Sequence, residues 1–74
     1  MSSSLERLRE ERFNFRDSER KAAEYILANS REVINLPITQ LAEQIGVSEA
    51  TIIRMCKKAG FSGFQELKIT LAME

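Results

Sequence analysis

Apolar residues recur every three or four positions along most of the chain, which is the spacing of one face of an α-helix. The sequence contains no run of strand-forming residues. The apolar runs are separated by Gly, Pro, Asn and Ser, residues that often end or begin helices. The pattern predicts an all-α fold, a compact bundle of five or six helices, over about residues 5–15, 17–30, 31–36, 38–45, 49–59 and 63–73.

The starts of three of these helices can be predicted from individual residues. Asp17 or Ser18 is expected to cap the helix over 17–30. Pro37 fits the first turn of the helix that follows it, where its missing N–H is not needed. Residues 62–65, Ser-Gly-Phe-Gln, match a capping box that would open the last helix.

A helix-turn-helix motif is predicted over about residues 38–59. The segment ITQLAEQIGVSEATIIRMCKKAG, residues 38–60, places a helical run on each side of a short Gly-Val-Ser turn. Gly46 accepts the left-handed conformation that ends a helix, and Ser48 can cap the next one. Ala42 is small enough for the second helix to cross close above it. Together these features predict two steeply crossing helices in a homeodomain-like arrangement.

The second helix of the motif has one apolar and one polar side when it is plotted at 100° per residue. The residues expected to face the core are Ile52, Met55, Cys56 and Ala59. The opposite side is basic and polar around Ala50, which suits a helix lying in the major groove of DNA. Arg54 can match O6 and N7 of guanine, Lys58 suits a phosphate, and Lys57 can do either. The residues expected to bind DNA are Ser48, Glu49, Ala50, Thr51, Ile53, Arg54, Lys57 and Lys58.

The charge is distributed unevenly, although the net charge is zero. Residues 50–68 hold four basic side chains against one acidic side chain, beside the predicted motif. Residues 1–24 interleave six basic and six acidic side chains, which is typical of a solvated helix surface. Within this segment Leu5 and Leu8 form an apolar stripe that we expect to be too narrow to dock firmly alone.

The composition excludes several classes of function. One Cys cannot form an internal disulfide, and the absence of His excludes a Cys/His zinc site and the commonest general base. We therefore expect no catalytic residues, no metal and no cofactor. No apolar run has the length of a membrane span or of a signal peptide, so we expect a cytoplasmic protein without membrane contact.

The segments DSERKAAEYIL and GVSEATIIRMCKKAGFSGFQELK resemble the N-terminal DNA-binding domain of RpiR-type bacterial regulators, over about residues 13–73. Helix-turn-helix proteins in general need not share Phe61, Gly63 and Phe64. The resemblance implies a sugar-isomerase-type domain in the same protein, which binds a phosphorylated sugar effector. It also implies homo-oligomers that regulate carbohydrate or amino-sugar genes. Residues 1–74 are thus expected to be a single domain from the N-terminal part of a longer regulator.

Two functions from different classes remain open at this point. The leading hypothesis is sequence-specific binding of double-stranded DNA in transcription control, and the alternative is a protein-interaction or oligomerisation module. An enzyme is the least supported class. Cys56 is expected to be a packing residue rather than a redox sensor. For the outward-facing Ile53, contact with a thymine methyl, a partner surface and chance exposure all remain open.

Overall fold

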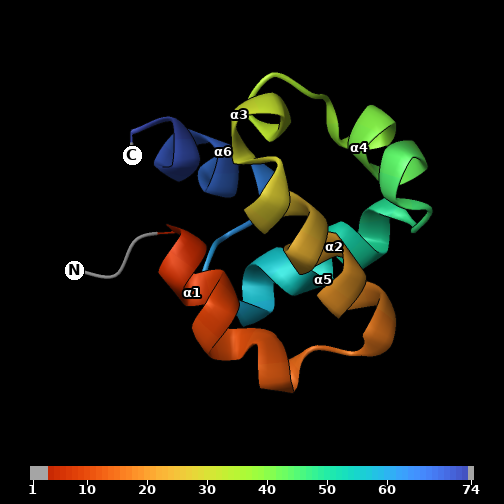
Figure 1. Ribbon diagram of the computed structural model, residues 1–74, viewed down its shortest axis with the longest axis vertical. Helices are drawn as coiled ribbons and strands as arrows, with labels where there is room; N and C mark the ends of the chain where they lie inside the picture. Colours follow the sequence, from red (N-terminus) through yellow and green to blue (C-terminus); the bar gives the residue numbers. More distant parts are fainter. Residues whose placement is uncertain (1–3, 74) are drawn as a thin grey trace.

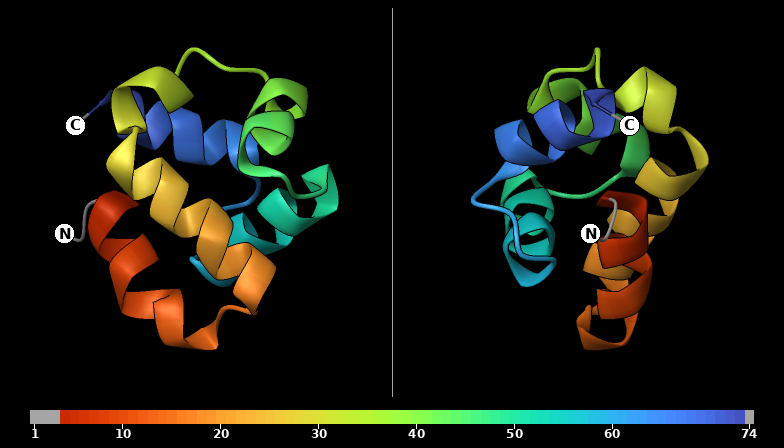
Figure 2. Two further views of the ribbon diagram at one scale, coloured as in Figure 1. Left: turned by 45° about the vertical axis from the view of Figure 1, so that its right-hand side comes forward. Right: turned by 90° about the vertical axis from the view of Figure 1, so that its left-hand side faces the viewer.

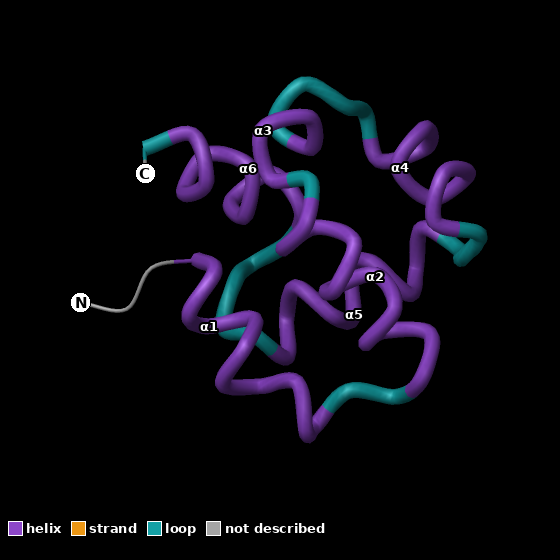
Figure 3. Tube along the Cα trace, viewed as in Figure 1, coloured by secondary structure: helices purple, strands orange, loops and turns teal. Residues whose placement is uncertain are grey.

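The computed structural model describes residues 4–73, which form six α-helices and one 3-10 turn. The elements are α1 (Ser4–Glu11), η1 (Arg12–Asn14), α2 (Asp17–Ala28), α3 (Ser30–Val33), α4 (Ile38–Ile45), α5 (Glu49–Lys58) and α6 (Phe64–Ala72). Short loops join the helices, and no strand occurs between residues 4 and 73 (Figure 3). The predicted all-α bundle is confirmed.

Helices α2 and α5 cross at the centre of the molecule (Figure 1). Helix α4 packs on both of them, and α1 packs on α2 and α6. In the left view of Figure 2, α1 and α4 lie on opposite sides of α2. Every helix contributes an apolar residue to one continuous core, which consists of Leu8, Phe15, Ala22, Ala23, Ile26, Val33, Leu41, Ala42, Ile45, Ile52, Met55, Cys56, Ala59, Phe61, Phe64, Leu67 and Leu71. Burial of this surface away from water is the main force that holds the helices together.

Helix α1 is docked more firmly than its apolar stripe predicts. Leu8 is fully buried, and α1 packs on both α2 and α6. The guanidinium carbon of Arg7 lies 5.0 Å from the centre of the Phe61 ring, within cation–π range. The side chain of Leu5 lies outside the described residues. The burial of Leu8 and the contact between Arg7 and Phe61 therefore hold α1 in place, although its apolar stripe is narrow.

The turn between α4 and α5 has the predicted geometry. Gly46 is left-handed, with φ of 87°, and its N–H donates to the carbonyl of Ala42 at 2.8 Å. The next N–H, of Val47, donates to the same carbonyl at 3.1 Å. The hydroxyl of Ser48 accepts from the N–H of Thr51 at 3.1 Å and so caps α5. These bonds satisfy backbone groups that a helix end leaves without partners.

The C-terminal end of α5 also has a left-handed glycine, but its two closing hydrogen bonds go to two different carbonyls. Gly60 is left-handed, with φ of 94°, and its N–H donates to the carbonyl of Lys57 at 3.0 Å. The N–H of Phe61 donates to the carbonyl of Cys56 at 2.9 Å. These two bonds form a Schellman motif, which stops α5 and turns Phe61 into the core.

Two helix starts differ from the prediction. Arg16, rather than Asp17 or Ser18, is the N-cap of α2, and its N–H donates to the carboxylate of Glu19 at 2.9 Å. This bond is possible because Glu19 occupies the third position of the helix and reaches back. Pro37 stands just before α4, with extended backbone, rather than inside the first turn.

The start of α6 also differs from the predicted capping box. Helix α6 follows Gly63, and no side chain caps it. Ser62 instead donates from its N–H and its hydroxyl to the Glu66 carboxylate, both at 3.3 Å. Gln65 takes no part in these bonds and is exposed. The acceptor therefore lies one position later than the capping-box spacing places it.

Replacing Gly46 with Ala tests the turn. The new Cβ would meet only the ammonium of Lys21, at 3.6 Å, so there is room for it, but the left-handed backbone disfavours any side chain. We expect the free energy of unfolding in urea to fall by about 1–2 kcal/mol. Gly63→Ala is the matched control, because its φ of 175° is ordinary extended backbone and its Cβ meets nothing within 4 Å. Equal effects of the two substitutions would contradict the role assigned to Gly46.

Candidate nucleic-acid interface

The helix-turn-helix presents one side of α5 to solvent and holds the other side in the core. The expected core residues Ile52, Met55, Cys56 and Ala59 are all buried. Seven of the eight residues predicted to bind DNA are exposed: Ser48, Glu49, Ala50, Ile53, Arg54, Lys57 and Lys58. The small side chain of Ala50 leaves the start of the helix open to close approach. The exposed side of α5 therefore has the shape and polarity of a surface that lies in a groove.

Thr51 is the exception, and its predicted place on the exposed flank is wrong. Its side chain is buried, with 5% of its surface exposed. Its hydroxyl shares a 2.9 Å hydrogen bond with the hydroxyl of Ser48 and accepts from Nη2 of Arg54 at 3.2 Å. Thr51 lies four residues before Met55 and so one turn from a core residue, a spacing that indicates this orientation.

Glu19 of α2 belongs to the same cluster of side chains as Arg54 and Lys58, and the sequence did not predict this. Its side chain is completely buried, yet it lies under the basic side of α5. One oxygen, Oε1, accepts from Nζ of Lys58 at 2.7 Å and from the N–H of Arg16 at 2.9 Å. The other oxygen, Oε2, accepts from Nε of Arg54 at 3.3 Å. A single carboxylate thus joins two cations of α5 to the start of α2.

These hydrogen bonds are what make a buried carboxylate tolerable. Burial alone raises the pKa of Glu19, because it removes the charge from water. Hydrogen bonds from Lys58, the Arg16 backbone and Arg54 outweigh this effect and hold the pKa below the ordinary value of 4.5. Glu19 also lies three residues before Ala22 and seven before Ile26, on the apolar face of α2. An acidic residue within an apolar stripe was the signal that could have identified it.

The cations of α5 are therefore not equivalent. Lys58 donates to Glu19 and, at 3.3 Å, to the carbonyl of Asn14, and its side chain is 35% exposed. Arg54 keeps 53% of its side chain exposed despite its two internal hydrogen bonds. Lys57 is exposed, and its ammonium has no ion pair or hydrogen bond within the described part of the chain. Lys57 is the cation most available to an external anion.

A family model described as a helix-turn-helix domain of the rpiR family matches residues 2–74. The chain belongs to the RpiR family. Its members carry helix-turn-helix domains of bacterial transcriptional regulators, which bind DNA, and the predicted family is confirmed. This RpiR-family domain is 45% identical over 73 residues to an uncharacterized HTH-type transcriptional regulator of Caldanaerobacter subterraneus subsp. tengcongensis. That match covers 99% of this chain and 26% of the relative, so the chain spans about a quarter of the length of such relatives.

Two solved structures are similar to this RpiR-family domain. The N-terminal domain of the regulator YbbH from Bacillus subtilis superposes with a TM-score of 0.87 at 33% identity, over 96% of this chain and 88% of that one. The NanR protein of Vibrio vulnificus, solved in complex with ManNAc-6P, superposes with a TM-score of 0.90 at 37% identity. The second match covers 96% of this chain and 27% of NanR. Both comparisons support the helix-turn-helix assignment.

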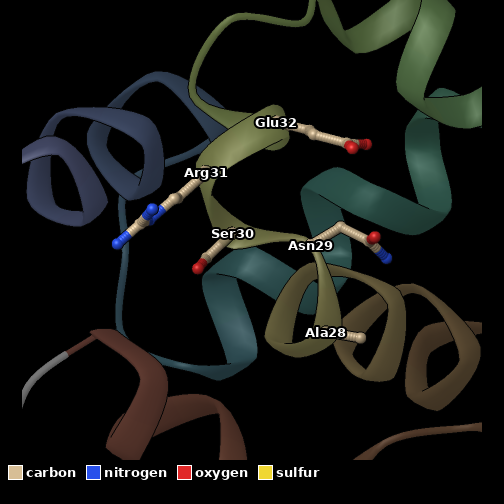
Figure 4. A pocket seen from close by; sticks show the side chains of 5 residues that line it. All are labelled: Ala28, Asn29, Ser30, Arg31 and Glu32. Carbon is tan, nitrogen blue, oxygen red and sulfur yellow. The ribbon is translucent and has the colours of Figure 1, made fainter.

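Elsewhere on the described part of this RpiR-family domain we find no cluster of functional groups that converge on one point. A shallow hollow lies at the junction of α2 and α3, but Arg31 and Glu32 point away from each other there (Figure 4). Among residues 4–73, no group of three or more His, Cys, Asp or Glu side chains is placed to hold a metal ion. None of the helices in the same range is long and apolar enough to cross a membrane. The basic side of α5 remains the surface with the clearest chemistry.

The pKa of Glu19 predicts how stability depends on pH. As the pH falls below about 5, the unfolded chain takes up a proton on Glu19 before the folded chain does, so the folded state loses stability. We expect Glu19→Gln to lower the free energy of unfolding by about 1.5–3 kcal/mol at pH 6, the worth of a hydrogen bond to a charged group. The difference between the variant and the wild type should shrink at pH 3. Urea unfolding at both pH values measures it, and a constant difference would contradict the assignment.

We expect the thiol of Cys56 to be unreactive in the folded chain. Burial raises the pKa of its thiol to about 12, so the reactive thiolate is scarce at pH 8. A thiol-specific disulfide reagent should label the chain in urea but not the native chain on the same timescale. Rapid labelling of the native chain would show that the packing role assigned to Cys56 is wrong.

Proposed function

We propose that this domain binds a specific sequence of double-stranded DNA, with α5 lying in the major groove, and thereby regulates transcription. The observation that carries the proposal is the exposed side of α5, which bears Arg54 and Lys57. Ala50 lies on the same side, and its small side chain allows DNA to approach the helix closely. Membership of the RpiR family supports the same conclusion. A recognition helix in this class contacts base edges mainly with its N-terminal residues.

Each exposed residue of α5 can be given a role. Arg54 reads a guanine through O6 and N7, and Ile53, which is 37% exposed, contacts a thymine methyl beside it. Lys57 contacts a phosphate as a flexible point charge. Ser48, Glu49 and Ala50 form the part of the helix that approaches the groove floor or the adjacent backbone.

Two of the residues predicted to bind DNA take different roles in this proposal. Thr51 acts from inside the protein, because its hydroxyl supports Arg54 and the cap at Ser48. Lys58 stands at the edge of the interface, with two of its three donors already directed to Glu19 and Asn14. We therefore assign the main phosphate contact to Lys57 rather than to Lys58.

We also propose that the chain is part of a longer protein, a homo-oligomeric cytoplasmic regulator of carbohydrate or amino-sugar genes. A further domain would bind a phosphorylated sugar, and the complex of the similar NanR protein with ManNAc-6P supports this choice of ligand. Oligomerisation would set two copies of α5 about 34 Å apart along the duplex, one helical turn of DNA. Linking two weak contacts in this way raises the affinity through the effective concentration of the second copy.

A comparison of Arg54→Ala with Lys57→Ala tests the proposed roles. Arg54→Ala should cost about 1–3 kcal/mol on a preferred duplex and relax the preference at one base pair. Lys57→Ala should weaken binding to all duplexes about equally and reduce the salt slope by about one unit. The measurement is a fluorescence titration with a duplex selected from a random library and with its scrambled counterpart, at several salt concentrations.

Arg31→Ala is the control for a lost positive charge, because Arg31 is exposed on α3, which packs on α2 and α6. It should leave the selected duplex bound with nearly wild-type affinity. If wild-type protein binds no duplex at low salt, DNA binding is refuted and the interaction-module hypothesis takes its place. If Arg54→Ala weakens both duplexes equally, Arg54 contacts phosphate and does not read a base.

A further inference from the structure

Arg54 is held by two bonds on one edge of its guanidinium group. Nε donates to Oε2 of Glu19 at 3.3 Å, and Nη2 donates to Oγ1 of Thr51 at 3.2 Å. Nε and Nη2 form the side edge of the planar group. The end edge, made of Nη1 and the outer proton of Nη2, has no partner within the described part of the chain. A bidentate contact with guanine needs two adjacent parallel donors, and the end edge provides them.

We propose that Glu19 is a positioning residue for sequence recognition, which fixes Arg54 so that only its end edge is available to a base. This inference rests on the proposed function, because it concerns how α5 distinguishes one DNA sequence from another. Glu19 does not itself reach the DNA surface, since its side chain is completely buried. It acts through Arg54, which comes from a helix 35 residues further along the chain.

Glu19 suits this role because its own position is fixed. It lies in the first turn of α2, and its Oε1 is held by the backbone N–H of Arg16 at 2.9 Å and by Lys58 at 2.7 Å. The anchor for Arg54 is thus a carboxylate that cannot swing outward without leaving its other partners. An arginine with a fixed guanidinium plane loses less conformational freedom when it meets a base than a freely rotating one does.

The charge of Glu19 should act in the same direction. One buried negative charge lies against two cations of α5, so it weakens their attraction for any nearby phosphate. Phosphate attraction contributes to binding of every sequence equally. Glu19 therefore lowers affinity for DNA in general while it orders the one contact that depends on sequence, and both effects raise selectivity.

Glu19→Gln tests this inference because it keeps the size of the side chain and removes the charge. The probes are a duplex selected from a random library with the wild-type chain at low salt, and a scrambled duplex of the same composition. The ratio of the two affinities should fall at least about fivefold, the low end of what a bidentate contact contributes. Binding of the scrambled duplex should become tighter, with a steeper dependence on salt.

Asp17→Asn is the matched control, since it removes the same charge from the same helix at a fully exposed position. It should leave the ratio of affinities unchanged. In an Arg54→Ala background, Glu19→Gln should change the ratio no further, because the residue through which it acts is missing. Equal loss of affinity for both duplexes, or an unchanged ratio in the wild-type background, would overturn the inference and leave Glu19 as a stability residue only.

The experiment distinguishes failure of this inference from two other outcomes. If the wild-type chain does not distinguish the duplexes, the proposed function itself fails, whatever the variants do. If circular dichroism shows that Glu19→Gln does not fold, Thr51→Val decides the question. That variant preserves side-chain shape but removes the second bond to Arg54, so it should lower the same ratio by a smaller factor. A folded Thr51→Val with an unchanged ratio would also count against the positioning role.

Discussion

A buried carboxylate is the constraint on which the arrangement of this domain depends. Glu19 is removed from water, and a charge in that position must be surrounded by donors or the fold becomes costly. The donors come from Arg16, Arg54 and Lys58, so satisfying one residue requires the start of α2 and the middle and end of α5 to meet in one orientation. The apolar contacts of the core are non-directional, whereas the hydrogen bonds of this cluster depend on the orientation of α5.

The same cluster links stability to the chemistry of the exposed surface. Arg54 and Lys58 contribute part of their hydrogen-bonding capacity to holding α5 in place, and only the remainder faces outward. Lys57 is exposed, and its ammonium makes no hydrogen bond or ion pair within the described part of the chain. The three cations of α5 therefore differ in the fold. The guanidinium of Arg54 is restrained, the ammonium of Lys58 is hydrogen-bonded to Glu19, and the ammonium of Lys57 has no partner within the described part of the chain.

Much of the fold follows from local features that are visible in the sequence. The left-handed turn at Gly46, the cap at Ser48 and the buried side of α5 each depend on residues within one or two turns of one another. The capping of α2 and α6 was less predictable, because several polar residues near each start compete for the same backbone groups. The firm docking of α1 depends on Leu8 meeting elements from the other end of the chain.

The role of Glu19 could not be predicted from the sequence for the same reason, because it depends on contacts between residues far apart in the chain. The side-chain partners of Glu19 lie 35 and 39 residues away, and no local spacing reveals such a pair. Plotting α5 as an isolated helix showed which residues point outward, but it could not show that Glu19 accepts hydrogen bonds from Arg54 and Lys58. The burial of Thr51 was closer to hand, since it depends on a neighbour one turn along the same helix.

The two left-handed glycines on either side of α5 limit the length of duplex that the helix could contact in the proposed complex. Between them the helix has 10 residues, which at 1.5 Å per residue is about 15 Å of rigid rod. Base pairs in a duplex are stacked at about 3.4 Å, so a rod of this length can lie beside no more than about four of them. A sequence of about four base pairs recurs many times in a genome. A regulator that used this helix would therefore need contacts with more than one such sequence to select a single binding site.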